Sequence, residues 1–409
     1  MRALGSIIND GLAAPISRRQ TSDTNDTKLR PKMASPIERK GGAIVAIETS
    51  PTDRAPTVKR RAPTRPITVG TRGSTLALWQ TTWALDRVRE RAPHAEFTLQ
   101  TITTQGDHTQ AHETPLARLG DKGVFVAELE RALLAGALDI AVQPMNDRAL
   151  VEAERSAWRR PTVDAAIHSL KDLPSVITPG LALAAIPERE DARDALVSRH
   201  GLGLRDLPEG AVVATSSLRR RAQLLAIRPD LRVIEMRGNI DTRLRKALAP
   251  DGPDATILAV AGMRRLGLDG YITETLPVET LTPAAGQGAL AIEARAGDRA
   301  TRRLLRVVDH LPTRRAVTAE RATLAGLGAG CLAPVGAHAL PSADGERLRL
   351  LAVVATPDGK RIIRAERAGP TSRPAALARA VVADLRRQGA DEIIQRVREA
   401  LAVEAERAR

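Results

Sequence analysis

The chain of 409 residues is too long for one compact core, and its 43% hydrophobic content is ordinary for a globular protein, so we expect two or three domains. No stretch approaches the roughly 20 apolar residues that cross a bilayer, and Asn9-Asp10 interrupts the short apolar run at Ile7-Ile8, so neither a membrane anchor nor a secretion signal is expected. The single cysteine excludes an internal disulfide, and without an export signal the chain is expected in the cytoplasm.

The net charge of +14 suggests nucleic-acid binding as one alternative, but its distribution argues against that class. Residues 1–65 hold 13 Lys and Arg against 6 Asp and Glu, so half of the surplus falls on a segment that we interpret as a disordered basic extension. Single-strand binders place basic residues among aromatic stacking platforms, and this chain has only 3 Trp, 1 Tyr and 2 Phe. Arginine without aromatics is better suited to carboxylate or phosphate ligands. DNA affinity that falls steeply with salt would support the alternative.

From Ile67 onward, strand-like and helix-like stretches alternate. This alternation predicts α/β domains with mostly parallel sheets. Near the C-terminus the pattern changes to a hairpin followed by helices, which indicates a separate small α+β domain. In chain order, the expected elements are strand 67–69, helix 75–91, strand 97–103, helix 124–138, strands 211–214, 232–234 and 256–260, hairpin strands 347–355 and 361–367, and a helical stretch at 374–401.

One short strand-like sequence occurs twice. Asp139-Ile140-Ala141-Val142 is echoed by Asp164-Ala165-Ala166-Ile167, and both cannot occupy the same strand position. The intervening segment is charged and compatible with a helix, so we interpret residues 143–163 as an insertion, with a gene-model error, an ancestral slip and a functional loop all left open. We expect the strand to be the second copy, because that copy is contiguous with the chemically informative segment that follows it.

Four arginine-bearing segments follow expected strands, at loop-to-helix transitions where α/β proteins bind anions. One such segment alone is weak evidence, because an arginine on a helix is usually solvated. Four of them indicate a polyanionic ligand held by many bidentate contacts. The segments are Gly70-Thr71-Arg72-Gly73-Ser74, Ala214-Thr215-Ser216-Ser217-Leu218-Arg219-Arg220, Met236-Arg237-Gly238-Asn239-Ile240-Asp241-Thr242-Arg243 and Ala261-Gly262-Met263-Arg264-Arg265.

The acidic candidate is Asp172, which follows a buried-looking strand and precedes Leu173-Pro174. At the carboxyl end of a strand, a carboxylate beside arginines can hold N–H donors and stabilise a developing cation. The residues alone leave a turn or cap aspartate equally open. His168, on the same strand, is interpreted as a packed structural residue rather than a base.

The only cysteine, Cys331, lies in Gly328-Ala329-Gly330-Cys331-Leu332-Ala333-Pro334. A free cysteine is usually a small buried hydrophobe. Small residues on both sides, however, make a loop whose backbone a bulky group can approach closely. A nucleophilic thiol in that position can carry a covalently attached group.

Nine motifs in a fixed order narrow the interpretation. They are TRGSTLALWQ, TQGD, DKGVFVAELE, HSLKDLP, TSSLRRRAQL, RGNIDTRL, AVAGMRRLGL, AAGQGALAIE and GAGCLAPVG. On these motifs the chain resembles the hydroxymethylbilane synthase family, also called porphobilinogen deaminase, from about Ile67 to the C-terminus, apart from residues 143–163. The resemblance implies a transferase of haem biosynthesis that condenses four porphobilinogen molecules head to tail and releases ammonia at each step.

The resemblance also implies a dipyrromethane cofactor, held by a thioether to the cysteine that matches Cys331. Asp172 would be the catalytic carboxylate, hydrogen-bonded to pyrrole N–H groups and stabilising the azafulvenium cation left when ammonia departs. Each pyrrole carries an acetate and a propionate, which explains the arginines. Cofactor binding is implied for Arg72, Ser74, Asp107, Lys171, Arg219, Arg220, Arg237 and Arg243; substrate binding for Arg72, Arg219, Arg220, Arg243 and Arg265; and a flexible active-site loop for Arg118, Lys122 and Phe125.

The family fold implied is α/β, with two periplasmic-binding-protein-like (type II) domains around a cleft and a small α+β C-terminal domain. The implied domains are 66–187 with 288–306 (domain 1, containing the 143–163 insertion), 193–282 (domain 2) and 311–401 (the cofactor-bearing domain). We expect a monomer that binds porphobilinogen, with no metal, nucleic acid or membrane as partner. A non-catalytic solute-binding protein of the same architecture is the remaining rival, but it would need export and would have no use for Cys331.

Overall fold

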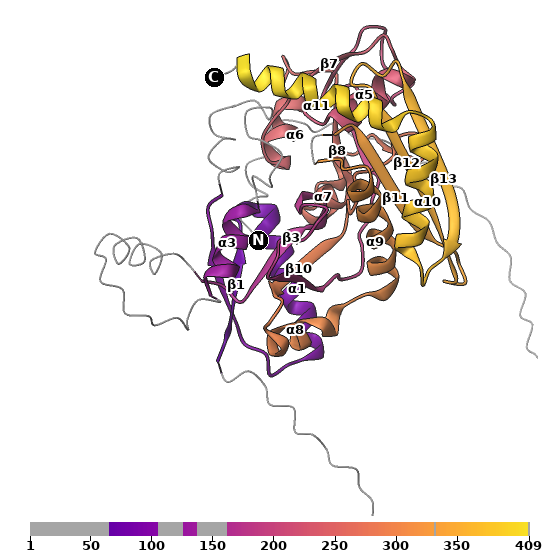
Figure 1. Ribbon diagram of the computed structural model, residues 1–409. Helices are drawn as coiled ribbons and strands as arrows, with labels where there is room; N and C mark the ends of the chain where they lie inside the picture. The colour runs from indigo at the N-terminus through magenta and orange to yellow at the C-terminus, as the bar shows by residue number, and fades with distance from the viewer. Residues whose placement is uncertain (1–64, 105–125, 137–161, 331–332, 408–409) are drawn as a thin grey trace, which may run out of the picture. The chain divides into compact units, whose positions relative to one another are not determined.

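The computed structural model describes residues 65–104, 126–136, 162–330 and 333–407 (Figure 1). Within these ranges the chain forms two five-stranded mixed sheets and one three-stranded antiparallel sheet. The prediction of an α/β chain with two sheet domains and a separate small C-terminal sheet domain is confirmed. Among the described residues, no helix combines the length and the apolar character that a membrane span requires.

The first sheet has the strand order β2-β1-β3-β10-β4. Strand β1 runs parallel to β2 and β3, whereas β10 runs antiparallel to β3 and β4. Its core contains Val69, Leu85, Ile167 and Ile292, all buried. The elements are β1 (Ile67–Thr71), α1 (Thr75–Arg91), β2 (Phe97–Thr101), α3 (Ala127–Ala135), β3 (Ala165–Ser169), the 3₁₀ helix η2 (Leu170–Asp172), β4 (Leu181–Ala185), β10 (Leu290–Arg295), α8 (Arg299–Leu305) and η4 (Arg306–Val308).

The second sheet repeats this plan with the order β7-β6-β8-β5-β9. Strand β6 runs parallel to β7 and β8, and β5 runs antiparallel to β8 and β9. Leu196, Val213 and Ile257 are central to its core. The elements are β5 (Asp194–Ser198), β6 (Val212–Ala214), α5 (Leu218–Ile227), β7 (Arg232–Ile234), α6 (Ile240–Leu248), β8 (Ala255–Ala259), α7 (Val260–Arg265), η3 (Asp269–Tyr271) and β9 (Glu274–Leu276).

The C-terminal sheet is a meander in which β12 pairs antiparallel with both β11 and β13. Helices α9 and α10 pack against each other, α9 against β11 and α10 against β13 (Figure 1). Gly389, with φ of +94°, separates α10 from α11, so the single helical stretch expected from the sequence is two helices. The elements are α9 (Leu311–Gly326), β11 (Val335–Pro341), β12 (Arg347–Ala355), β13 (Ile362–Pro370), α10 (Pro374–Arg387) and α11 (Ala390–Arg407).

The expectation of mostly parallel sheets is wrong, because half of the strand pairings in each five-stranded sheet are antiparallel. In each sheet one strand, β10 or β5, runs against both of its neighbours. Strand β10 enters the first sheet only after the chain has completed the second sheet. The local strand–helix alternation that predicts parallel pairing therefore does not govern this strand.

The position of β3 shows which copy of the repeated strand-like sequence forms the strand. Ala165 to Ser169 form this strand, and the Asp164 backbone N–H donates to the Thr68 carbonyl at 2.7 Å. Asp164 is buried and accepts hydrogen bonds from Arg65 and Arg295, and these bonds fix the residue directly before β3. The second copy is thus the strand that runs directly into His168–Pro174. The first copy, residues 139–142, lies outside the described residues.

Candidate active site

The predicted site residues follow equivalent strands in the two five-stranded sheets. In the first sheet, β1 leads to α1 and β3 leads to η2; in the second, β6 leads to α5 and β8 leads to α7. The carboxyl ends of neighbouring parallel strands meet at one edge of a sheet, where α/β proteins bind ligands. The topology therefore gathers the predicted residues at the carboxyl-end edges of both sheets.

Asp172 is held by the 3₁₀ turn that ends β3. Leu170 and Leu173 on either side are buried, whereas Lys171 and Asp172 are half-buried. The Leu170 backbone N–H donates to the Ala289 carbonyl at 3.0 Å, which ties the turn to the segment before β10. Two buried leucines thus anchor a turn that leaves the lysine and the aspartate partly accessible.

Lys171 lies in a crowded electrostatic environment. Burial lowers the pKa of Lys171 to about 8; Asp172 and Asp194 act to raise this pKa, while Arg220 and Arg219 lower it further. Lys171, from the first sheet, therefore lies within electrostatic range of Arg219 and Arg220 at the start of α5 and of Asp194 on β5, from the second sheet. The structure thus brings together predicted residues that are far apart in the sequence.

Helix α5 begins at an N-cap serine. The Ser217 Oγ accepts from the Arg220 backbone N–H at 3.4 Å, as expected for a serine at this position. The side chains of Arg219 and Arg220 are nevertheless buried rather than solvated. Arg219 also donates to the Thr282 carbonyl and Arg220 to the Ile257 carbonyl, each at 2.8 Å.

Both guanidinium groups contact Asp194, the first residue of β5. The Arg219 Nη1 lies 2.8 Å from Oδ2, and the Arg220 Nη2 lies 2.7 Å from Oδ1. Gln287 donates to the same Oδ1 at 2.8 Å. Although burial opposes ionisation, the two arginines hold the pKa of Asp194 well below its usual range. The sequence analysis missed Asp194, whose only signal is an acidic residue directly before the apolar run Ala195-Leu196-Val197.

Arg237 and Arg243 flank the turn that enters α6. The Arg243 Nε donates to the Gly238 carbonyl at 2.7 Å, and Gly238 has φ of +121°, which favours glycine. Burial lowers the pKa of Arg243 to about 10, and Arg220 and Arg237 lower it further while Asp172 raises it. The Arg237 Nη1 is buried and has no hydrogen-bond acceptor among the described residues.

The remaining described site residues are Arg265, Ser74 and Arg72. Arg265 donates from Nη2 to the Gly288 carbonyl at 2.6 Å, and burial lowers its pKa to about 10. Ser74 caps α1 by accepting from the Ala77 backbone N–H at 3.3 Å, and Arg72 is half-buried just before it. Among the described contacts, none joins Ser74 or Arg265 to Lys171 or Asp172.

His168 is buried, as expected for a packed residue, but it has a charged neighbour. Its Nε2 lies 3.4 Å from the Oε2 of Glu293 on β10. Among the described residues, neither carboxylate oxygen of Glu293 has a hydrogen-bond donor. His168 precedes Asp172 by four residues, on the strand that leads to η2, and its pairing with Glu293 was not predicted.

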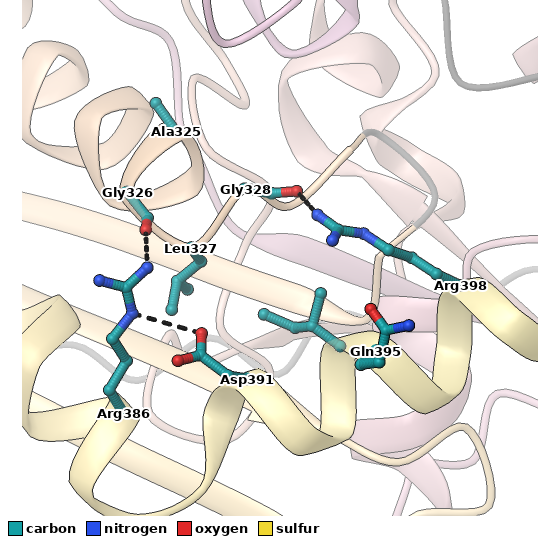
Figure 2. Close-up of a pocket in the computed structure, with 9 residues that line it drawn as sticks. Ala325, Gly326, Leu327, Gly328, Arg386, Asp391, Gln395 and Arg398 are labelled. Atoms are coloured by element: carbon teal, nitrogen blue, oxygen red, sulfur yellow. Dashed lines mark hydrogen bonds and ion pairs between the residues drawn. The ribbon is translucent and has the colours of Figure 1, made fainter.

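Several predicted residues lie outside the described ranges: Cys331, Asp107, Arg118, Lys122, Phe125 and nearly all of the 143–163 insertion. The segment that leads to Cys331 is described as far as Gly330. A hollow of about 510 Å³ lies beside it, lined by the end of α9, by Arg386 of α10 and by helix α11 (Figure 2). Arg386 donates to the Gly326 carbonyl at 2.8 Å, and Arg398 donates to the Gly328 carbonyl. These two arginines donate to carbonyls at the end of α9 and directly after it, and so hold the segment that precedes Cys331.

The charge balance at the Lys171–Asp172 end fits a ligand that carries several carboxylates. Lys171, Arg219, Arg220, Arg237 and Arg243 are linked there to only two described carboxylates, Asp172 and Asp194. Burial is the main cause of the lowered pKa values of Lys171 and Arg243, and the buried Arg237 Nη1 has no hydrogen-bond acceptor among the described residues. Carboxylate ligands would supply charge-assisted partners for these donors.

Comparison with curated proteins gives close relatives over most of the chain. The porphobilinogen deaminase of Desulforudis audaxviator is 47% identical and covers 82% of this chain and 98% of its own length. That of Deinococcus deserti is 46% identical, over 82% of this chain and 100% of its own. That of Thermus thermophilus is 44% identical with the same coverage.

The solved structures that resemble this chain include distant relatives. A periplasmic binding protein of Salmonella typhimurium with high arginine specificity is 13% identical, with a TM-score of 0.31 over 60% of this chain and 91% of its own. The periplasmic aliphatic sulphonate binding protein SsuA of Escherichia coli is 12% identical, with a TM-score of 0.30 over 63% of this chain and 71% of its own.

Two family descriptions match the chain itself. "Porphobilinogen deaminase, dipyromethane cofactor binding domain" matches residues 67–157 and 149–303, and "Porphobilinogen deaminase, C-terminal domain" matches residues 314–387. The first match is split into two pieces that overlap at residues 149–157, inside the 143–163 segment. The chain belongs to the porphobilinogen deaminase family, transferases that join porphobilinogen units into hydroxymethylbilane on a dipyrromethane cofactor in tetrapyrrole biosynthesis.

Proposed function

We propose that Asp172 is the catalytic carboxylate with which this chain, a hydroxymethylbilane synthase, condenses four porphobilinogen units and releases ammonia at each step. The observation that carries the proposal is that Asp172 lies on an anchored turn among cations from the other sheet, Arg220 and Arg243 included. A carboxylate fixed there can accept from pyrrole N–H groups. It can also stabilise the cation that porphobilinogen becomes on losing ammonia, without reorganising as the charge develops.

The surrounding cations are proposed to bind carboxylates of cofactor and substrate. Lys171, Arg219, Arg220, Arg237 and Arg243 form this set, which we name the cation cluster. Each acetate or propionate can accept a bidentate pair of bonds from a guanidinium group. Arg72, Ser74 and Asp107 are also proposed to bind the cofactor, and Arg72 and Arg265 the substrate. Arg118, Lys122 and Phe125 are proposed to belong to a flexible active-site loop.

Cys331 is proposed to hold the dipyrromethane by a thioether. It is the only thiol of the chain, and it follows Gly328-Ala329-Gly330, where a bulky group can approach the backbone. The cofactor supplies the primer to which porphobilinogen units are added. Measured by mass spectrometry, the purified protein should exceed its polypeptide mass by two pyrrole units, and Cys331→Ser should lose both the adduct and activity. An active enzyme with the mass of the bare chain would contradict this assignment.

The 143–163 segment is proposed to be a dispensable insertion. The split match to the family inside this segment and the second copy's place as β3 support this proposal. Joining Ala141 to Ile167 would put Asp139 where Asp164 now binds Arg65 and Arg295. The joined variant should form hydroxymethylbilane. A well-folded but inactive variant would show that the segment contributes to the site.

The chain is further proposed to act as a monomer in the cytoplasm, without nucleic acid or membrane as partner. Exposed arginines of the C-terminal domain have carboxylate neighbours within the chain: Arg361 with Glu392, Arg367 with Asp384 and Arg349 with Glu279. Such pairing removes much of the positive field that a polyanion would need. Porphobilinogen turnover that is unaffected by added duplex DNA, and one species in sedimentation, would agree with this proposal.

A further inference from the structure

Asp194 has an unusual position for a residue with no assigned role. It is fully buried, and the described contacts give both of its oxygens hydrogen-bond donors. Two of the three donor residues, Arg219 and Arg220, belong to the cation cluster. Isolated buried carboxylates are costly, and this one is stabilised because two cations lie against it.

The contacts of the two arginines show how Asp194 limits their freedom. Arg220 uses Nε and Nη2 on Asp194 and Nη1 on the Ile257 carbonyl. Arg219 uses Nη1 on both Asp194 and the Thr282 carbonyl. A guanidinium group that is held on one edge has a fixed plane, so its remaining N–H groups have fixed directions. Fixing a donor before the ligand arrives reduces the entropy lost on binding.

We infer that Asp194 is the positioning residue of the cation cluster: it orients Arg219 and Arg220 for ligand carboxylates and acts as their buried counter-ion. This inference rests on the proposed binding role of those arginines. Asp194 does not itself contact the ligand in this assignment. It acts through the arginines and through the electrostatic environment of Lys171.

The second part of the role follows from charge. The groups that face Lys171 are Asp172 on its own turn, Arg219 and Arg220 on α5, and Asp194 on β5. Asp194 favours the protonated lysine and the two arginines oppose it. Replacing the carboxylate by an amide removes the favourable contribution and leaves the unfavourable ones. The Lys171 ammonium should then lose its proton at lower pH than in the wild type.

The test compares Asp194→Asn with Asp191→Asn. Asp191 also pairs with two arginines, Arg193 and Arg264, but both of these arginine side chains are exposed and lie outside the cation cluster. For Asp194→Asn we expect KM for porphobilinogen to rise about tenfold, the effect of one lost charge-assisted contact, with a smaller change in kcat. The pH above which KM rises should also shift downward. Asp191→Asn should change neither quantity.

A chemical readout tests orientation without turnover. Phenylglyoxal modifies accessible arginines, and peptide mass mapping identifies which residues react. Arg219 and Arg220 should react faster in Asp194→Asn than in wild type, and equally in Asp191→Asn and wild type. Unchanged reactivity together with unchanged KM would overturn the inference.

Three further variants keep the outcome decisive. If Asp194→Asn does not fold, Gln287→Ala removes one donor from Asp194 without leaving a charge, and it should raise KM about two- to threefold; an unchanged KM would count against the inference. Arg219→Gln and Arg220→Gln test the proposed function separately. If they leave KM unchanged, the binding role of the arginines fails; if they raise KM while Asp194→Asn and Gln287→Ala do not, only the role of Asp194 fails.

Discussion

The two five-stranded sheets share one plan but hold their buried carboxylates differently. In each sheet the fourth strand in spatial order, β10 or β5, runs antiparallel to both neighbours. Each of these strands carries a fully buried acidic residue, Glu293 on β10 and Asp194 on β5. Asp194 receives bonds from two arginines and a glutamine, whereas Glu293 has one basic neighbour among the described residues, His168 at 3.4 Å.

This difference separates an ion pair with arginines from a contact with a histidine. Arginine stays protonated throughout the range in which proteins are folded, so Asp194 keeps its counter-charge at every working pH. A histidine supplies a counter-charge only when protonated. The second sheet therefore contributes fixed cations to the site, while the first contributes the turn with Asp172 and a buried carboxylate without fixed compensation.

The largest expected effect is on kcat, because the proposed catalytic carboxylate, Asp172, comes from the first sheet alone. Asp172→Asn should lower kcat about a hundredfold or more, because the amide keeps the size but loses the charge that stabilises the substrate cation. The fold and most of the substrate affinity should remain, because the anchors Leu170 and Leu173 are untouched. Steady-state kinetics and circular dichroism measure both. A kcat within a few-fold of wild type would remove Asp172 from the mechanism.

The comparison of the two carboxylates is tested by stability. Asp194→Asn should cost about 3–5 kcal/mol in unfolding free energy, the usual loss when one partner of a buried ion pair is removed. Glu293→Gln should change it by no more than about 1 kcal/mol, because no described donor is lost. Urea unfolding at pH 8 gives both values. Equal losses would mean that Glu293 is as well compensated as Asp194.

Titration of Lys171 should affect substrate binding more moderately. With a pKa of about 8, the ammonium is largely charged at pH 7 and largely neutral at pH 9. KM for porphobilinogen should therefore rise over this range, by up to about tenfold for one charge-assisted contact. Lys171→Arg keeps its charge throughout and should flatten this part of the profile. The same rise in Lys171→Arg would assign the pH dependence to another group.

The smallest expected effect belongs to Glu130, which lies near Glu293 and His168. Burial raises the pKa of Glu130 above 4.5, Thr178 lowers it by donating to Oε2, Glu293 raises it and His168 lowers it. A raised folded-state pKa means stability that is fully present below pH 4.5 and is lost as pH rises through the folded value.

Glu130→Gln replaces the ionisable carboxyl by an amide, so the stability that Glu130 loses on ionising is retained. The variant should therefore be more stable than wild type at pH 7. The gain should be less than about 1 kcal/mol, since the carboxyl is partly solvated. The gain should disappear below pH 4.5. Melting temperatures of both proteins between pH 4 and 8 check the sign. A gain that persists at low pH would point to a packing effect instead.

Local sequence was sufficient for elements and residues whose environment is set by near neighbours. Helix α1 spans the predicted 75–91, because Ser74 supplies an N-cap and the following residues have helical periodicity. The strand before Asp172 is the predicted second copy, since only that copy is contiguous with the turn. The arginine segments after β6, β7 and β8 lie at strand ends, as their sequence positions indicate.

Only the tertiary structure decided how those arginines are used. Arg219 and Arg220 were expected to face ligand carboxylates directly, yet part of each guanidinium group faces Asp194, which precedes them by 25 and 26 residues. The antiparallel β10 and its Glu293 likewise meet β3 only after the chain returns from the second sheet. The physical reason is common to both. A cap or a periodic face depends on residues within a few positions, whereas the partner of a buried charge is set by which distant strands come together.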